Sequence, residues 1–275
     1  MTIIEQQSAA SLFEQIGEVR FELIPAKNII ERAVYSLPSH ATLTITCSPT
    51  KGIDTTIDMA ITMAKNFTRV VPHIAARMVK SKNHLTDVLH TLKSYHLDEI
   101  FVVGGDYQNP LGPYHNGYDL LKAISKQDHH LRHIGIPAYP EGHPNVDQHT
   151  LDQDLMKKSA FATYTVTQMC FDFEQIFSWL KNQRDAGLTL PVYLGIPGPV
   201  RIDKLLRVAS RIGVTDSLRF LRKNLRLSGK LLRGYDALTL LTNYTAHLND
   251  INNNVSGLHA YTFNELDTIK KKWAF

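Results

Sequence analysis

Eight short runs rich in β-branched and aromatic residues recur along the chain, and most are followed by a longer stretch with helical spacing of apolar residues. Parallel strands need a crossover between them, so this alternation is typical of successive βα units. Eight such units favour a closed (β/α)8 barrel, an α/β fold, over an open doubly wound sheet. The expected strands are residues 19–25, 41–47, 69–75, 99–105, 133–139, 164–170, 190–196 and 257–263.

The stretches between these runs are long enough to cover a barrel on its outside. A chain of 275 residues has the usual size of one α/β barrel, and no internal repeat, low-complexity tract or linker divides it. We therefore expect a single catalytic domain over residues 1–275. The expected helices are 27–36, 53–66, 83–95, 117–127, 150–158, 173–185, 202–211 and 264–273, with an extra helical segment near 215–249.

The composition indicates a soluble, cytoplasmic protein. Hydrophobic residues make up 43% of the chain and charged residues 20%, which is ordinary for a globular protein. The first twenty residues lack the pattern of a secretory signal, and no apolar run reaches the ~20 residues of a membrane span. The net charge of +4 suits anionic ligands without requiring nucleic acid. The two cysteines, Cys47 and Cys170, provide neither a disulfide framework nor metal-ligand spacing, so we expect reduced thiols.

Polar residues stand at or just beyond the ends of the apolar runs. In an α/β barrel, the loops after the carboxyl ends of the strands form the active site, so these side chains are expected to converge on one mouth. The residues are Glu22, Thr46, His73, Asp106, Tyr139, His143 and Gln168.

Glu22 and Asp106 are the two candidate catalytic carboxylates. Glu22 lies between Phe21 and Leu23, where loss of hydration would favour the neutral acid and suit a proton donor. The alternative is a glutamate paired with a lysine or arginine inside the barrel. Asp106 follows two glycines at a strand end, where a ligand can approach the backbone, although Gly-Gly-Asp also occurs in simple turns.

The segment 135–144, Gly-Ile-Pro-Ala-Tyr-Pro-Glu-Gly-His-Pro, is more specific. Its prolines and glycines fix a non-helical loop directly after an expected strand. The loop carries Tyr139, which can stack or hydrogen-bond, and His143, which can donate to a phosphate or a ring oxygen. This combination indicates a ligand-binding loop.

Taken together, these motifs resemble the methylenetetrahydrofolate reductase family. The similarity runs in order from about residue 19 to residue 265. Residues 21–27 resemble the family's Phe-Glu-Phe-Phe-Pro-Pro-Lys, residues 72–74 its Pro-His-Leu, and residues 105–106 the end of its Arg-Gly-Asp. Residues 138–144 are similar to its flavin loop, residues 167–172 to its Thr-Gln-Phe-Phe-Phe-Asp, and residues 258–264 to its eighth-strand motif.

The resemblance implies an enzyme that binds FAD across the barrel mouth and uses NADH or NADPH as co-substrate. Its substrate would be a one-carbon derivative of tetrahydrofolate, interconverted between 5,10-methylene and 5-methyl forms in either direction. Glu22 would protonate the folate so that its five-membered ring opens, and Asp106 would tune the electron flow. The cofactor-binding residues implied are Thr46, His73, Gly105, Asp106, Ala138, Tyr139, His143 and Asp152, with Lys157 or Lys158 beside the phosphates; the substrate-binding residues implied are Gln168, Lys204 and Tyr261.

Three positions depart from the family pattern. Gly104 stands where an arginine usually precedes Gly-Asp, Val208 where an aromatic residue stacks on folate, and Glu265 where an arginine follows Thr-Leu-Asn. These changes leave open a variant without tightly held flavin, a reversed direction, and a tetrahydrofolate-dependent methyltransferase or demethylase on the same barrel. A homo-oligomer is compatible with any of these.

Two further features have simpler interpretations. The group His129-His130-x-x-His133 lacks the first-strand His-x-His of barrel metallohydrolases, so we expect a solvated turn and no metal. The basic residues of 219–233 are expected to form a solvated face, with a site for the folate tail as the next interpretation. Nucleic acid ranks last for this stretch because no aromatic stacking surface accompanies the charge, and we expect no nucleic acid partner. A non-catalytic folate or RNA binder that uses the basic stretch is the third functional hypothesis.

Overall fold

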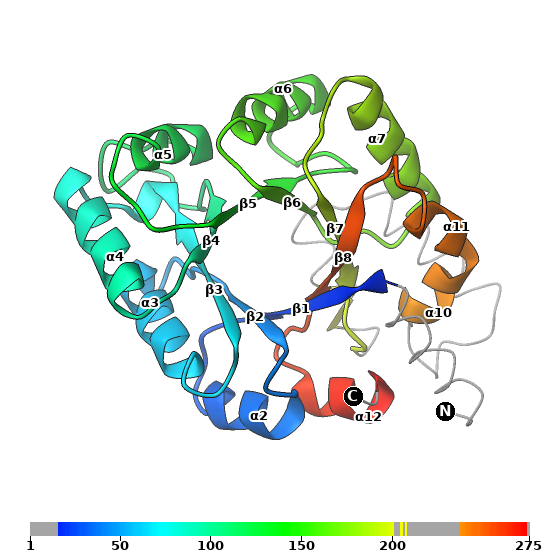
Figure 1. Ribbon diagram of the computed structural model, residues 1–275, viewed down its shortest axis with the longest axis horizontal. Coiled ribbons are helices and arrows are strands. Elements are labelled where there is room, and N and C mark those ends of the chain that lie inside the picture. Colours follow the sequence, from blue (N-terminus) through cyan, green and yellow to red (C-terminus); the bar gives the residue numbers. More distant parts are fainter. Residues whose placement is uncertain (1–15, 201–203, 206, 208–236, 274–275) are drawn as a thin grey trace.

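The eight strands close into a parallel barrel in which each strand pairs with the next along the chain and β8 pairs with β1 (Figure 1). The computed structural model describes residues 16–200, 204, 205, 207 and 237–273. The barrel expected from the sequence is confirmed. Its strands are β1 (Glu18–Leu23), β2 (Thr42–Ile45), β3 (Arg69–Ala75), β4 (Glu99–Val103), β5 (His133–Ala138), β6 (Tyr164–Thr167), β7 (Val192–Pro197) and β8 (Val255–Tyr261).

Helices surround the barrel and alternate with the strands (Figure 1). None of the described helices has the length and apolar character needed to cross a bilayer. The helices are α2 (Ile29–Ser36), α3 (Gly52–Met63), α4 (Lys82–Ser94), α5 (Gly117–Ile124), α6 (Gln148–Ser159), α7 (Phe173–Asp185), α10 (Ala237–Leu241), α11 (Thr245–Leu248) and α12 (Leu266–Trp273), with short 3-10 turns η1 (Ala76–Met78) and η3 (Thr242–Tyr244).

Several helices begin where a side chain caps the free amide groups of the first turn. Ser81 accepts a hydrogen bond from the amide of His84 at the start of α4, and Asp147 accepts one from Thr150 at the start of α6. Asp172 caps α7 in the same way. These caps satisfy amides that have no partner within the helix, so they fix where each loop at the mouth ends.

Some expected boundaries were wrong. β6 ends at Thr167, so residues 168–170 lie beyond the strand, and β4 ends at Val103, because the chain turns through Gly105 at a φ of 89°. β7 begins at Val192, after Pro191, which has no amide to donate to a ladder. Of the expected helical segment 215–249, the described part forms α10, η3 and α11; most of the expected helix 202–211 lies outside the described residues.

Side chains of β1 alternate between the helical layer and the barrel interior. Phe21 is buried and its ring lies 6.1 Å from that of Trp273 in α12. Arg20 points inward, where its guanidinium lies 3.9 Å from the ring centre of Tyr193 and 4.3 Å from that of Tyr164. Because side chains alternate along a strand, Glu22 shares the interior face with Arg20.

A partly buried ionic network, which we call the floor network, lies at the amino-terminal end of the barrel. It consists of Glu18, Arg20, Arg69 and Glu99, with ion pairs of 2.6 Å from Arg20 to Glu99 and from Arg69 to Glu99. Arg20 and Glu99 are each 1% exposed. Burial opposes ionisation of Glu18, but Arg20, hydrogen bonds from Thr42 and Tyr193, and Arg69 outweigh it and lower the pKa of that carboxyl. Charged side chains of the floor network therefore occupy the interior at this end of the barrel.

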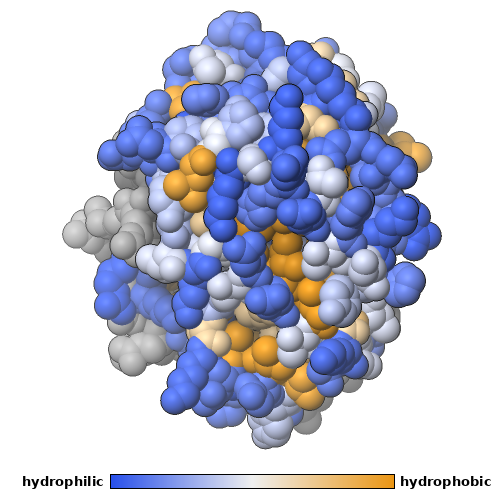
Figure 2. Space-filling model, turned by 90° about the vertical axis from the view of Figure 1, so that its left-hand side faces the viewer, coloured by the Kyte–Doolittle hydropathy of each residue, from blue (hydrophilic) through white to orange (hydrophobic). Residues whose placement is uncertain are grey.

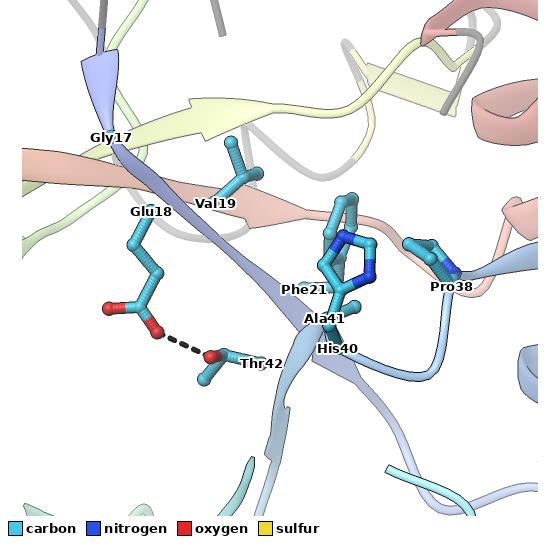
Figure 3. Close-up of a pocket in the computed structure, with 8 residues that line it drawn as sticks. All are labelled: Gly17, Glu18, Val19, Phe21, Pro38, His40, Ala41 and Thr42. Atoms are coloured by element: carbon cyan, nitrogen blue, oxygen red, sulfur yellow. Dashed lines mark hydrogen bonds between the residues drawn. The ribbon is translucent and has the colours of Figure 1, made fainter. Parts of the chain in front are cut away.

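A pocket of about 210 Å³ lies beside the floor network (Figure 3). Glu18 and Thr42, which are hydrogen-bonded to each other, line one side, while Phe21, Pro38 and His40 line the other. These residues belong to the amino-terminal ends of β1 and β2 and the segment before β2. The pocket is thus at the opposite end of the barrel from the strand-end residues singled out above.

The face on the left of Figure 1, around α4, is mostly hydrophilic, with a band of hydrophobic surface through its middle (Figure 2). In α4, Leu85, Val88, Leu89 and Leu92 are buried, which is the three-and-four spacing of a helix that packs one side against a sheet. The outer polar side of such a helix accounts for the hydrophilic part of this face.

Gly195 in β7 allows a close approach of β6 and β8, and we expect Gly195→Ala to destabilise the protein by about 1–3 kcal/mol through overpacking. A Cβ atom there would lie 2.1 Å from the carbonyl oxygen of Thr167 and 2.9 Å from the ring of Tyr261. Urea unfolding followed by circular dichroism measures the effect. Gly104→Ala is the matched control, because a Cβ at Gly104 meets nothing within 4 Å. Equal stability of the two variants would contradict this packing.

Candidate functional site

Glu22 lies near the carboxyl end of β1, inside the barrel mouth, with its side chain 16% exposed. Its Oε2 atom is 3.4 Å from Nε2 of His259 in β8. Arg20, two residues earlier on the same face, pairs with Glu18 and Glu99 instead. Among the described residues, therefore, the ionisable side chain that contacts Glu22 is a histidine, and the alternative of a lysine or arginine partner is not what the structure shows.

His73 lies on β3 close to Glu22 and is held in its neutral form. Its ring packs 4.8 Å from that of Phe101, and Nε2 is buried without a hydrogen-bond partner among the described residues. Burial lowers the pKa of His73 to about 4; Glu22 opposes this shift and His259 adds to it. A neutral imidazole with a free nitrogen is suited to contact a ligand atom at this depth.

Tyr139, in the loop after β5, belongs to the same end of the barrel as Glu22. Burial raises the pKa of Tyr139 to about 12, and the carboxylates of Asp154 and Asp106 add to the shift. Burial likewise raises the pKa of Tyr261 well above its usual range, with further contributions from Glu22 and Tyr139. Glu22, Tyr261, Tyr139 and Asp106 all lie at or just beyond the carboxyl ends of parallel strands of the barrel, so they share one mouth.

The loop after β4 brings Gly105 and exposed Asp106 to this mouth. Gly105 has a φ of 89°, and a Cβ atom there would lie 3.0 Å from Cβ of Ala75, so the backbone is bare at this point. Arg77 holds the loop, donating to the carbonyl oxygens of His115 at 2.7 Å and Tyr107 at 3.1 Å. Tyr107 in turn donates to the carbonyl oxygen of Pro49, which ties this loop to the one after β2.

The remaining expected cofactor-binding residues surround the mouth at different depths. Ala138 ends β5 and is buried, and the ring of exposed His143 meets that of Tyr139 edge-on at 5.5 Å. Thr46, just after β2, is half-buried. In α6, Asp152 accepts hydrogen bonds from Gln148 and Gln183, buried Lys158 pairs with Asp154 at 2.6 Å, and Lys157 is exposed.

The expected substrate-binding residues lie on the side of β6, β7 and β8. The side-chain oxygen of Gln168 accepts from the amide of Met169, and the hydroxyl of Tyr261 donates to the carbonyl oxygen of Thr167 at 3.1 Å. Lys204 contacts Glu265 at 2.6 Å and the carbonyl oxygen of Phe263 at 3.1 Å. Glu265, one of the three departures from the family pattern, is therefore the counterion of Lys204.

Some residues singled out in the sequence lie away from this mouth, and others lie outside the described part of the chain. His129, His130 and His133 are near the amino-terminal end of β5, where the ring of His130 lies 2.8 Å from the carbonyl oxygen of Leu97. Cys47 and Cys170 follow the carboxyl ends of β2 and β6, and neither forms a disulfide among the described residues. Val208 and the basic stretch 219–233 lie outside the described residues.

Three residues that contact Glu22 or the nearby Ile24 were not predicted as site residues from the sequence. They are His259, Thr262 and Asn264, all within or just after β8. His259 and Tyr261 are two residues apart, and this spacing places both on the same face of a strand, so the alternation could have indicated an inward-facing histidine. Thr262 and Asn264 carry no such signal, because they lie in the turn beyond the strand.

The buried neutral state of His73 makes stability depend on pH. With an ordinary value of 6.5 in the unfolded chain and about 4 in the folded protein, its contribution is complete above about pH 6.5 and is lost as pH falls toward 4. The loss is about 3 kcal/mol. Urea unfolding at pH 7 and pH 4.5 should show a smaller pH dependence for His73→Gln than for the unaltered protein. Exposed His90→Gln is the control, and the same pH dependence in all three proteins would contradict the assignment.

Comparison with known proteins yields one family. The pattern of the family described as methylenetetrahydrofolate reductase matches residues 26–272. The chain is 33% identical over 90 residues to "Methylenetetrahydrofolate reductase 2" of Saccharomyces cerevisiae and 30% identical over 100 residues to "Methylenetetrahydrofolate reductase 1" of Schizosaccharomyces pombe. These matches cover 31% and 35% of the chain, and only 15% and 16% of the two relatives.

Solved structures resemble the chain in fold alone. A chain of the tryptophan synthase complex of Pyrococcus furiosus has a TM-score of 0.53 at 10% identity, with 94% of this chain and 96% of that chain covered. A GH18 chitinase mutant of Cycas revoluta has a TM-score of 0.51 at 12% identity, with 94% and 98% covered. At these identities, the likeness supports the barrel and carries no information about chemistry.

Proposed function

Because the chain belongs to the methylenetetrahydrofolate reductase family, we propose that it is a flavin-dependent oxidoreductase that interconverts 5,10-methylenetetrahydrofolate and 5-methyltetrahydrofolate. The observation that carries this proposal is the position of Glu22. A carboxyl group 16% exposed inside the mouth, 3.4 Å from a buried histidine, is placed to deliver one proton to a ligand above it. Among the described residues, no lysine or arginine side chain forms an ion pair with the Glu22 carboxylate.

The residues proposed to hold FAD fit that role on two observations. Nε2 of His73 is a buried polar atom without a described partner, and the bare backbone at Gly105 lets a planar ring approach the end of β4. Tyr139 and His143 supply an aromatic edge and an imidazole on the loop after β5. FAD, when bound, supplies the hydride chemistry between NADH or NADPH and the folate.

The protein's own residues bind, orient and protonate the substrate. We assign to Glu22 the proton that opens the folate ring, and to Asp106 the position of a carboxylate near the flavin and the folate. Gln168 and Tyr261 would contact the folate from the β6 and β8 side. Lys204 would contribute there as well, although its ion pair with Glu265 at 2.6 Å must then be shared or broken.

Anaerobic reduction tests this function. The purified protein, supplemented with FAD, is mixed with 5-methyltetrahydrofolate and, separately, with NADH and with NADPH. We expect loss of the flavin absorbance near its visible maximum with the folate and with at least one nicotinamide. Reduction by neither would overturn the proposal. If the protein binds folate but binds no FAD at any FAD concentration tested, only the flavin-independent variant suggested by Gly104 would remain.

A second candidate function is that of a tetrahydrofolate-dependent methyltransferase or demethylase. The same experiment, extended by one step, distinguishes it from the oxidoreductase. The Lys204–Glu265 pair is the observation that favours it, because Glu265 places a negative charge where the family carries an arginine. That enzyme would transfer the methyl group to a second substrate without oxidising a nicotinamide. Reduction of the flavin by NADH or NADPH, followed by its reoxidation with 5,10-methylenetetrahydrofolate, would rule out this candidate.

A further inference from the structure

Three residues of β8 and the turn that follows it contact the end of β1 and the residue after it. Nε2 of His259 lies 3.4 Å from the carboxylate of Glu22, and the hydroxyl of Thr262 donates to the main-chain carbonyl oxygen of Glu22. The side chain of Asn264 accepts from the amide of Ile24 at 2.9 Å and donates to its carbonyl oxygen at 2.9 Å. Both the backbone and the side chain of Glu22 are therefore held from the same neighbouring element.

The turn adopts a backbone conformation that requires such contacts. Phe263 and Asn264 have φ values of 49° and 62°, two consecutive non-glycine residues in the left-handed region. This conformation is unfavourable for residues with a Cβ atom, above all for a bulky one such as Phe263. It persists because the surrounding contacts determine it, and such strain often lies beside functional groups.

Nε2 is the ring nitrogen of His259 that can donate a hydrogen bond to Glu22. Its ring is 2% exposed, and Nδ1 has no hydrogen-bond partner among the described residues. A neutral imidazole carries one N–H group. If the proton were on Nδ1, it would be buried without an acceptor, whereas on Nε2 it points to the carboxylate of Glu22. The Nε2–H tautomer is therefore favoured.

The other side chains that face Glu22 either hydrogen-bond to a different residue or make no hydrogen bond to its carboxylate. Tyr261, also on β8, donates its hydroxyl proton to Thr167. His73, on β3, packs against Phe101, and its Nε2 atom has no hydrogen-bond partner among the described residues. Thr44 is the residue of β2 in register with Glu22, and its hydroxyl has no partner among the described residues. His259 is thus the ionisable group within hydrogen-bond reach that orients the acid.

We propose that His259 is the positioning residue for Glu22. Its Nε2–H group orients the carboxyl toward the mouth and stabilises the carboxylate that remains once Glu22 has given its proton to the folate nitrogen; His259 itself neither gains nor loses a proton. The turn at Thr262 and Asn264 fixes the backbone from which Glu22 projects. This role rests on the proposed function, but the position of the proton-donating carboxyl can be measured without turnover.

The test compares His259→Leu, which removes the donor at similar volume, with His259→Gln, whose amide can restore a donor near the Nε2 position. Single-turnover reoxidation of reduced FAD by 5,10-methylenetetrahydrofolate, the direction in which Glu22 gives its proton, and reduction of bound FAD by the active nicotinamide are each followed against pH. For His259→Leu, we expect the folate step to slow by about 10- to 100-fold and the midpoint of its pH profile to rise by about one unit, because a donor that favours the carboxylate is lost. The nicotinamide step should keep its rate, and His259→Gln should recover most of the folate step.

An infrared measurement provides the readout that does not depend on activity. The carboxyl band of Glu22, identified by subtracting the spectrum of Glu22→Gln, should titrate at higher pH in His259→Leu than in the unaltered protein. His130→Leu is the matched control, since the ring of His130 contacts a carbonyl oxygen at the opposite end of the barrel at 2.8 Å. We expect that variant to leave both steps and the carboxyl titration unchanged.

The outcomes separate the two proposals. An unshifted carboxyl titration in His259→Leu would overturn the positioning role whatever the protein catalyses. Equal slowing of both steps with no change of the pH midpoint would also overturn it, because that is the result of a structural role alone. A shifted titration in a protein that shows no folate turnover would uphold the contact and overturn the proposed function.

Discussion

Replacing Glu22 with glutamine is expected to slow the folate half-reaction by about 10²- to 10⁴-fold, the usual contribution of a positioned general acid. Glutamine keeps the shape of the side chain and the neighbourhood of His259, but it has no proton to give. Transfer between the nicotinamide and the flavin needs no proton on the folate, so that step should stay within a few-fold of its original rate. Stopped-flow absorbance measures the two steps separately.

The thermal midpoint of Glu22→Gln serves as the control for folding, and it should lie close to that of the unaltered protein. If both half-reactions fell together in a correctly folded variant, Glu22 would be needed for flavin binding and not for proton delivery. If neither fell, the acid would have to be another group at the mouth, with exposed Asp106 the first to examine.

Replacing Arg20 with methionine is expected to destabilise the protein by about 3–5 kcal/mol, because it leaves buried carboxylates without their main counterion. Arg20 is 1% exposed and pairs with Glu99 at 2.6 Å and Glu18 at 3.2 Å, and its guanidinium lies over the rings of Tyr164 and Tyr193. Glu99 is equally buried and, among the described residues, would keep Arg69 as its ion-pair partner. The thermal midpoint should fall by roughly 10 °C, measured by circular dichroism.

Arg132→Met is the matched control for this experiment. Arg132 also pairs with an aspartate, Asp98, but its side chain is 77% exposed, and exposed ion pairs contribute at most about 1 kcal/mol. Similar losses in the two variants would mean that the floor network does not stabilise the barrel as proposed. The double variant Arg20→Met/Glu99→Leu should recover part of the loss, because it removes a stranded buried charge.

The barrel and much of its mouth could be predicted because they depend on local patterns. Strand-length apolar runs indicate βα units, and the position of a residue at the end of such a run places it at the mouth, as for Glu22, His73 and Tyr139. The end of β6 at Thr167 was missed because apolar residues continue beyond it with Met169 and Cys170. The end of β4 at Val103 was missed because the two glycines that follow it have no side chains to mark where the strand stops.

The contacts that give these residues their properties could not be predicted, because they join distant parts of the chain. Glu22 and His259 are 237 residues apart, and Arg20 and Glu99 are 79 apart. In the sequence, Lys204 is a candidate ligand and Glu265 a departure from the family pattern; only the fold shows that they form an ion pair. Pairing across a closed barrel depends on register and side-chain reach, which one sequence does not encode in any local signal.

The central claim is that the carboxyl of Glu22 and the loop of Tyr139 serve one site where a folate is reduced or oxidised. The most direct measurement is chromatographic analysis of the folates after incubation of the FAD-supplemented protein with 5,10-methylenetetrahydrofolate and NADH or NADPH, and with 5-methyltetrahydrofolate and an electron acceptor. We expect interconversion of the two folates in at least one direction, and its loss in Glu22→Gln. Folates recovered unchanged from both incubations, by a protein that is folded and binds them, would contradict the account.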